Sequence, residues 1–389
     1  MKDFRAIVEE YAKIDFTQRR AALATVIKVH GSSYRSPGAR MLITDDGRWV
    51  GSISGGCLEG DALRKARQVM QEKHAITVTY DTREESNQNL GIGLGCNGVI
   101  DVLIEPVTPG DPMNPVSLFE SFIGINEPLA LATAFAPDQL AGCKLLINPH
   151  GEIVGGSDKK LPKELIHELQ ALFKSKKSET REYETTCVFL ELVQPIVSVI
   201  LFGGGFDARP VSQLVRSLGW NVEVTDECVA HIAPVFFPEA TRLSLCQREF
   251  IDREFAITPY TACVLMSHNY EYDRDVLRKL IASDTPYIGI LGPRKRFDRM
   301  LEEFNSEGIN LTSAQLAKIH SPIGLDIGAE APDEIAVSIV AEIQSVFARR
   351  SGGFLKYRSG PIHQRGHGSD EVFKQVFLDE SEPRLSNQQ

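Results

Sequence analysis

The sequence predicts an α/β protein with two domains, an N-terminal α+β domain built on an internal repeat and a C-terminal domain with a doubly wound parallel sheet. Two observations carry this prediction. Stretches in the first half of the chain resemble each other at an offset of 104 residues, and the second half alternates apolar runs with helical patterns. At 389 residues the chain is also too long for one ordinary core.

The first domain is expected to span residues 1–195, with repeat halves at about 20–106 and 128–195. An amphipathic helix opens it. GARMLITDDGRWVGS (38–52) recurs as GCKLLINPHGEIVGG (142–156), and each copy predicts a strand, a hairpin, a helix and a closing strand. Because duplicated segments share a scaffold, segments that only one copy contains are better candidates for function.

Three segments occur in the first half alone: GSSYRSPG (31–38), SGGCLEG (54–60) and GIGLGCNG (91–98). The first offers hydroxyls, backbone donors and one arginine, which suit an anionic or heteroaromatic ligand, although a solvated turn has the same composition. Glycines in the other two segments let the backbone approach a ligand closely.

Ser54, Gly55, Gly56 and Cys57 form the sharpest local feature, and Cys57 falls at the start of a predicted helix. Unpaired amides at a helix start stabilise a thiolate, which is the nucleophilic and metal-binding form of cysteine. We therefore expect Cys57 to contact a cofactor or metal; the alternative is a small buried thiol beside a tight turn.

Cys96 lies among glycines that serve either a ligand or a strand bulge. The remaining cysteines stand in apolar or strand contexts, and most of them are expected in the core: Cys143, Cys187, Cys228, Cys246 and Cys263. Seven scattered cysteines without a C-x-x-C motif or a signal peptide indicate free thiols and a cytoplasmic protein.

The second domain is expected over residues 196–350, followed by a loosely ordered polar tail at 351–389. Ile196–Phe202 is an apolar run without alternation, as in a strand covered on both faces. CVLMSHNY (263–270) and PYIGILGP (286–293) predict further strands, and EIAVSIVAEIQSVFARR (334–350) predicts a closing helix.

GGGFDA (203–208) fits G-x-G-x-x-A between a strand and a helix, which is typical of a Rossmann-like fold. Gly203 and Gly205 would let a phosphate approach the helix start, and Asp226 ends the next strand, where an acid binds ribose hydroxyls. The same glycine turn can instead serve strand–helix packing alone.

Further polar residues follow the later strands of the sheet. His268 comes directly after one strand, and Arg294 and Arg296 come after the next. Since ligands of open α/β sheets bind beyond the carboxyl ends of the strands, we expect these three side chains to line one crevice suited to phosphate.

Composition excludes several classes of function. The hydrophobic fraction of 42% is that of a globular protein, and no run of about 18 apolar residues predicts a membrane span. The net charge of −10, with no basic block, argues against nucleic-acid binding.

Together these segments resemble the XdhC/CoxI family of xanthine dehydrogenase accessory factors. The matching stretches run in family order: GSSYRSPGARMLITDDG, GSISGGCLEGD, GLGCNGVIDVLIEP, LFGGGFDARP, SHNYEYD, YIGILGPRKR and SPIGLDIGAEAPDEIAVSIVAEI. Three motifs depart from the family pattern. Ser267-His268-Asn269 stands for Thr-His-Asp, Cys96-Asn97-Gly98 for Cys-Gly-Gly, and Gly204 for alanine, and the first two departures leave individual ligand contacts open.

The resemblance implies a chaperone that binds molybdenum cofactor (molybdopterin) and protects it while a cysteine desulfurase or sulfurase installs the terminal sulfur. The cofactor would then pass to an apo molybdenum hydroxylase of the xanthine dehydrogenase type. Cys57 would be a ligand of the metal, and the chain would be a carrier, expected as a homo-oligomer, rather than an enzyme.

An alternative function is that of an NAD(P)-dependent oxidoreductase, with NAD(P) or another nucleotide at Gly203–Ala208 and His268 as acid or base. The SGGCLEG segment favours the carrier function. It lies outside the predicted Rossmann-like domain, and the chemistry of a dehydrogenase would not require its cysteine. A purely structural assembly factor without a ligand is a third alternative.

Overall fold

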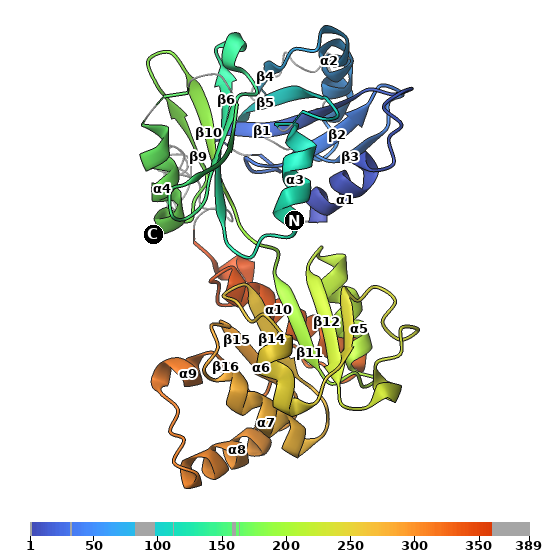
Figure 1. Ribbon diagram of the computed structural model, residues 1–389, viewed down its shortest axis with the longest axis vertical. Coiled ribbons are helices and arrows are strands. Elements are labelled where there is room, and N and C mark those ends of the chain that lie inside the picture. The colour runs from blue at the N-terminus through green and yellow to red at the C-terminus, as the bar shows by residue number, and fades with distance from the viewer. Residues whose placement is uncertain are drawn as a thin grey trace, which may run out of the picture. The chain divides into compact units, whose positions relative to one another are not determined.

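The computed structural model describes residues 2–31, 33–81, 98–111, 113–157, 161–162 and 164–359. The chain divides into two compact units, which take in residues 3–194 and 195–357. The first unit holds two antiparallel sheets and the second a six-stranded parallel sheet, so the predicted fold class is confirmed (Figure 1).

The first sheet belongs to the first repeat half and has the strand order β3-β2-β1-β5-β4. Every neighbouring pair in it is antiparallel. Its elements are α1 (Lys2–Tyr11), β1 (Ala21–Gly31), β2 (Arg40–Thr44), β3 (Trp49–Gly51), α2 (Glu59–Glu72), β4 (Ile76–Asp81) and β5 (Gly98–Val107).

The second sheet repeats this plan with the order β8-β7-β6-β10-β9. Its elements are α3 (Pro115–Ile123), β6 (Leu129–Ala136), β7 (Lys144–Ile147), β8 (Ile153–Gly156), α4 (Leu165–Ser175), β9 (Glu179–Glu182) and β10 (Cys187–Val193), with a 3-10 turn at Asp138–Leu140. Strand for strand it corresponds to the first sheet, as the internal repeat predicts.

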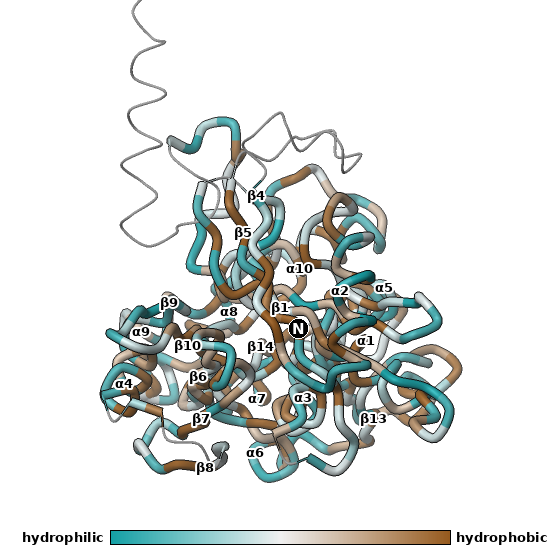
Figure 2. Tube along the Cα trace, turned by 90° about the horizontal axis from the view of Figure 1, so that it is seen from above, coloured by the Kyte–Doolittle hydropathy of each residue, from teal (hydrophilic) through white to brown (hydrophobic). Residues whose placement is uncertain are grey.

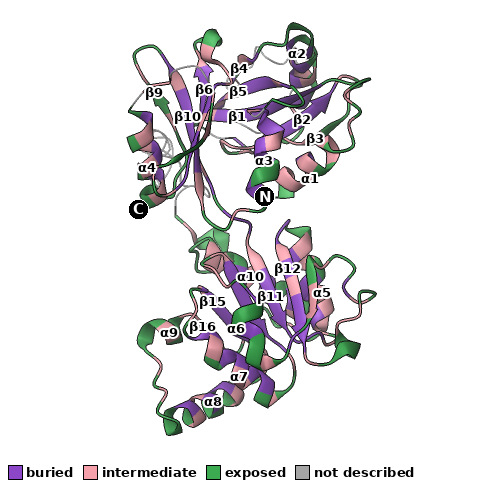
Figure 3. Cartoon of the chain, viewed as in Figure 1, coloured by how far each residue is buried: buried purple, intermediate pink, exposed green. Residues whose placement is uncertain are grey.

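Alternation along the central strands explains how the two sheets pack. Ala22, Ala24 and Val26 of β1 pack against α2, whereas Leu23 faces the second sheet, where it joins a cluster with Leu131. The small residues of β6 pack in the same way against α4. The order of layers is therefore α2, first sheet, second sheet, α4, and the buried strands stand out in Figure 3. Hydrophobic stretches also follow β1 and β5 in the trace of Figure 2.

Two buried ion pairs connect the repeat halves, and each joins a cation of one half to a carboxylate of the other. Arg40 of the first half pairs with Glu191 of the second, and Lys144 of the second half pairs with Glu105 of the first. Arg40 and Lys144 are separated by the repeat offset. The halves therefore pack around an approximate two-fold relation.

The second unit contains the parallel sheet, in the order β13-β12-β11-β14-β15-β16. Its strands are β11 (Ser198–Phe202), β12 (Asn221–Asp226), β13 (Arg242–Leu245), β14 (Thr261–Leu265), β15 (Tyr287–Ile290) and β16 (Ile319–His320). The order reverses between β11 and β14, which makes this the topological switch point.

Helices cover both faces of this sheet. One face packs against α5 (Ala208–Ser217) and α10 (Pro332–Phe347). The other packs against α6 (Ile251–Glu254), α7 (Tyr270–Leu280) and α8 (Arg294–Ser306). The unit also has α9 (Ser313–Ala317) and 3-10 turns at Val229–His231, Arg248–Phe250 and Leu355–Tyr357. Of the predicted tail, residues 360–389 lie outside the described residues.

No helix in the described part of the chain is long and apolar enough to cross a membrane.

Candidate functional site

The Ser54–Cys57 loop connects β3 to α2 and depends on glycine. Gly55 and Gly56 have φ values of +141° and +121°, which side-chain-bearing residues rarely adopt. A Cβ on Gly55 would lie 3.0 Å from the ring of Tyr34, whereas one on Gly56 would meet nothing within 4 Å. The loop is thus closed by Tyr34 on one side and open at Gly56.

Glu59, in the first turn of α2, is enclosed by this loop. Its carboxylate accepts hydrogen bonds from the amides of Ser54 at 3.0 Å, Gly56 at 3.0 Å and Leu58 at 3.2 Å. It also accepts from the hydroxyls of Ser54 at 2.5 Å and Ser52 at 2.8 Å. Burial raises the pKa of Glu59, but these hydrogen bonds outweigh burial and lower it to about 2.

Glu59 was not among the predicted site residues, and its contacts bear directly on Cys57. The amides that were expected to stabilise a Cys57 thiolate are donated to the Glu59 carboxylate instead. Cys57 itself is half-buried and packs against the core beneath α2. The residue is thus partly exposed beside the exposed Gly56, without amides of its own.

The other cysteines divide by burial. Cys143, Cys246 and Cys263 are buried and Cys187 is half-buried, whereas Cys228 is exposed and is the exception among the five. It follows the end of β12 at the start of a 3-10 turn, where the chain leaves the sheet. Cys96 lies outside the described residues. Among the residues the structure describes, no three His, Cys, Asp or Glu side chains gather as they would around a metal ion.

The glycine turn of the second unit is shaped by the packing of the protein itself. A Cβ on Gly203 would lie 2.5 Å from the backbone of Ser267, and one on Gly204 would lie 2.5 Å from the carbonyl oxygen of His231. Only Gly205 faces a side chain at ordinary distance, the His268 ring at 3.7 Å. Gly203 and Gly204 are therefore required without any ligand.

Asp226 is likewise engaged within the protein. Its carboxylate accepts from the Gly204 amide at 2.9 Å and the Cys228 amide at 2.8 Å, and it lies 3.0 Å from His231 Nδ1. A ribose would have to displace His231 to reach this buried carboxylate. The geometry weighs against the expected ribose contact.

A cavity of about 290 Å³ lies beyond the carboxyl ends of β11, β14 and β15, at the switch point of the sheet. It is lined by Asp207, Met266, His268, Leu291, Gly292, Pro293 and Arg296. His268 has φ +59° and its Nε2 lies 3.2 Å from Asp207 Oδ2. The structure thus brings two predicted residues, His268 and Arg296, into one crevice.

Arg294 is not part of that crevice. Its side chain is 73% exposed and its nearest acid is Asp298, at 3.8 Å. Arg296, by contrast, donates to the buried carboxylate of Asp273 at 2.7 Å. Burial raises the pKa of Asp273, and hydrogen bonds from Ser267 and Arg296 oppose that rise.

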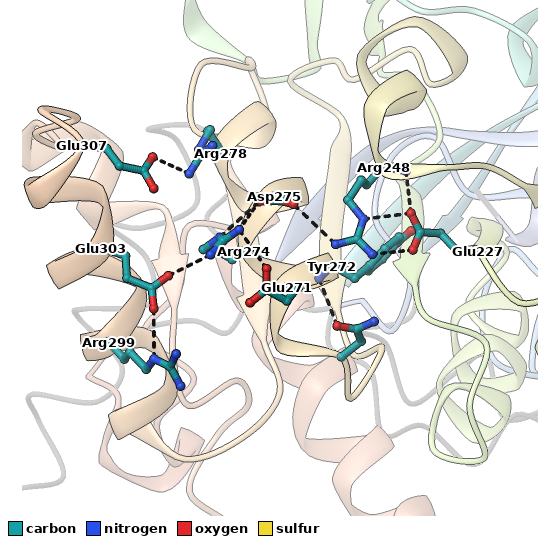
Figure 4. Close-up of polar contacts among 11 residues, drawn as sticks. Glu227, Arg248, Glu271, Tyr272, Arg274, Asp275, Arg278, Arg299, Glu303 and Glu307 are labelled. Atoms are coloured by element: carbon teal, nitrogen blue, oxygen red, sulfur yellow. Dashed lines mark hydrogen bonds and ion pairs between the residues drawn. The ribbon is translucent and has the colours of Figure 1, made fainter.

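Polar residues around α7 hold the unit together. Arg248 pairs with Glu227 and with Asp275, and Arg274 pairs with Asp275 and Glu303 (Figure 4). Asn269, which stands where the family pattern has aspartate, caps α7 by accepting from the Tyr272 amide at 3.3 Å. These polar side chains around α7 therefore bind one another or cap the helix.

Comparison with known proteins gives a consistent assignment. The family model described as XdhC Rossmann domain matches residues 199–343, and the one described as XdhC and CoxI family matches residues 17–81. A protein of Bacillus subtilis (strain 168), named as a probable subunit of xanthine dehydrogenase, is 31% identical over 84% of this chain and 93% of its own length. The molybdenum cofactor insertion chaperone PaoD of Escherichia coli (strain K12) is 22% identical over 88% of this chain and 89% of its own length.

A crystal structure described as a xanthine dehydrogenase from Bacillus halodurans superposes with a TM-score of 0.73 at 30% identity, covering 91% of this chain and 98% of that one. The similarity extends over both units, since each is matched by its own family model. This chain belongs to the XdhC and CoxI family.

Proposed function

We propose that this protein is a carrier that binds molybdenum cofactor, protects it during sulfuration and helps insert it into a molybdenum hydroxylase of the xanthine dehydrogenase type. Membership of the XdhC and CoxI family supports this proposal, as does similarity to a relative named as a molybdenum cofactor insertion chaperone. On this proposal the protein is a cytoplasmic homo-oligomer, and its partners are the apo enzyme and a sulfurase.

The observation that carries the proposal is the Cys57 loop. A half-buried thiol stands next to the open side of Gly56. A closed set of three or four ligands would retain a metal, as structural sites do. One thiol leaves the cargo's own ligands in place and lets the cargo depart, as a carrier requires.

Glu59 contributes by fixing this loop. Its carboxylate collects the amides on both sides of Gly55, so the loop holds its shape before the cargo arrives. A preorganised loop reduces the entropy that binding must offset. Tyr34, lying against Gly55, adds an exposed aromatic ring beside the thiol for a heteroaromatic cargo.

The test is anaerobic equilibrium binding of molybdenum cofactor to wild type and to Cys57→Ser. We expect affinity to fall by about tenfold or more, because one metal–thiolate contact is lost. Cys228→Ser is the matched control, since it removes an exposed thiol from the other unit. Unchanged affinity in Cys57→Ser, or an equal loss in both variants, would overturn the assignment of Cys57.

The crevice of His268 and Arg296 is proposed to accept a small anionic group rather than a dinucleotide. Asp226, the acid that would bind the ribose of a dinucleotide, is engaged by its own chain. Titration with NAD and NADP is therefore expected to show no saturable binding. Tight binding of either nucleotide would restore the oxidoreductase alternative.

A further inference from the structure

An acid stands in the crevice at the switch point of the parallel sheet. Asp207 lines this cavity of about 290 Å³ together with His268 and Arg296. An arginine and a histidine suit an anion, whereas a carboxylate repels one. A ligand of the crevice therefore has to satisfy both kinds of group.

The carboxylate of Asp207 has accepting capacity to spare. Its Oδ2 lies 3.2 Å from His268 Nε2, and its side chain is 25% exposed. Asp207 directly precedes α5, where an aspartate ordinarily accepts from the amides of its own helix, but it makes no such capping bond. Among the residues that the structure describes, none donates a hydrogen bond to Oδ1. This oxygen therefore remains free to accept from a ligand.

Donors for an oxyanion border the same cavity. Arg296 gives one amino group to the buried carboxylate of Asp273 at 2.7 Å, while its buried Nε atom has no acceptor within the described part of the chain. Two helices also begin here, since Asp207 precedes α5 and the cavity-lining Pro293 precedes α8. Unpaired amides at helix starts attract anions. The crevice thus offers donors from several groups and an acceptor from Asp207.

The backbone at His268 is held in an unusual conformation beside this acid. His268 has φ +59°, in the left-handed region that favours glycine. Its ring lies close to Gly205, where a Cβ would be 3.7 Å from the ring carbon Cδ2. Such conformations persist where the surrounding structure over-determines them, and they cluster at functional sites. The pairing of His268 with Asp207 is therefore a candidate for function.

The charges that border the crevice balance one another. Arg296 is paired with Asp273, and a protonated His268 is paired with Asp207. Two cations thus stand against two carboxylates, with no excess positive charge for a doubly charged ion. An ion with one negative charge is accommodated more easily than an ion with two.

We propose that the crevice binds a phosphate group that carries one negative charge and retains a proton, either free phosphate or a phosphate monoester. The proposal rests on the anion site proposed above and names the ligand of that site. Oxygens of the phosphate accept from Arg296 and from the helix starts, while its P–OH group donates to Asp207 Oδ1. An oxyanion without a proton would place lone pairs against that carboxylate and leave it unsatisfied.

The experiment is calorimetric titration of the full-length protein at pH 6 with methyl phosphate and with methyl sulfate. About half of the methyl phosphate is singly charged and protonated at this pH, because its second pKa is about 6. Methyl sulfate has the same shape and a single charge but no proton. We expect methyl phosphate to bind at least about tenfold more tightly, since a site built to pair with a hydroxyl rejects an analogue that lacks it. Inorganic phosphate is titrated in parallel, and the tighter of the two phosphates identifies the free ion or the ester as the source.

A variant pair tests the acceptor. The amide of Asp207→Asn can donate to an unprotonated oxygen, so this variant should bind methyl sulfate about as tightly as methyl phosphate. Such a gain of binding cannot come from a loss of structure. Asp298→Asn makes the same change at an exposed acid of α8 that does not line the cavity, and should keep the wild-type preference.

Failure of this proposal differs from failure of the anion site itself. If neither phosphate nor methyl sulfate binds, the crevice is not an anion site, and both proposals are overturned. If methyl phosphate and methyl sulfate bind wild type equally, the anion site stands and the requirement for a proton is overturned. A preference for methyl phosphate that persists in Asp207→Asn would overturn the role of Asp207 as the acceptor.

Discussion

At the scale of single residues, carboxylates of this protein occupy the donor sites that its ligands were expected to use. Glu59 takes the amides of the Ser54–Cys57 loop and Asp226 takes the Gly204 amide. At the start of α10, where no ligand was predicted, Glu334 likewise accepts from the Glu330 and Ala331 amides. Helix starts attract anions, and here the protein supplies the anion itself.

Glu59→Gln is expected to destabilise the first unit. The low pKa of Glu59, about 2 against an ordinary 4.5, corresponds to about 3 kcal/mol of folding free energy that the charged form contributes. Because the folded-state pKa is depressed, this contribution is complete above pH 4.5 and is lost as the pH falls toward 2. Urea unfolding of wild type and variant should therefore differ most near pH 7 and less near pH 3.

A difference that stays constant between those two pH values would mean that the loss comes from packing rather than from charge. Glu72→Gln is the control, since that carboxylate stands at the other end of the same helix and is exposed. Its free energy of unfolding should match wild type within about 0.5 kcal/mol.

The sequence predicted that His268 and Arg296 share one crevice because that prediction needed only the rule that residues after the carboxyl ends of neighbouring parallel strands lie together. It did not find Glu59, whose role depends on the backbone bend at Gly55 and Gly56. It also did not separate Arg294 from Arg296. Two residues apart on a helix, they point to different sides, and the side that faces the crevice is set by how α8 packs.

At the scale of elements, the start of α8 offers a matched comparison. Arg296→Ala leaves the buried carboxylate of Asp273 without its cation, and should cost about 3 kcal/mol of stability. Arg294→Ala removes an exposed arginine two residues away, and should cost less than about 0.5 kcal/mol. Chemical unfolding followed by circular dichroism measures both. Equal effects would show that the Asp273 ion pair contributes nothing.

The internal repeat predicted the strands of both sheets better than it predicted how the two halves pack against each other. Similar segments at a fixed offset implied two similar sets of strands, and both sheets have the same strand order. The exchange of ion pairs between the halves could not be predicted. Arg40 and Glu191 are 151 positions apart, and nothing in the repeat says whether each cation pairs within its half or across.

At the scale of the whole molecule, each unit contains its own hydrophobic clusters. The parallel sheet of the second unit is covered on both faces by helices from residues 195–357, and its two clusters draw only on those residues. A unit that buries its apolar residues without help from the remainder of the chain meets the main requirement for independent folding.

The fragment 195–359 is therefore expected to fold alone. It retains Trp220, which is 6% exposed and packs in the cluster under α5 and α10, and lacks Trp49 of the first unit. Its fluorescence should come from one buried indole and shift to the red in a single cooperative transition with urea. Circular dichroism should lose helix signal over the same urea range, because α5 and α10 pack in that cluster. Red-shifted emission without denaturant, or a gradual change, would mean that the parallel sheet needs the first unit in order to fold.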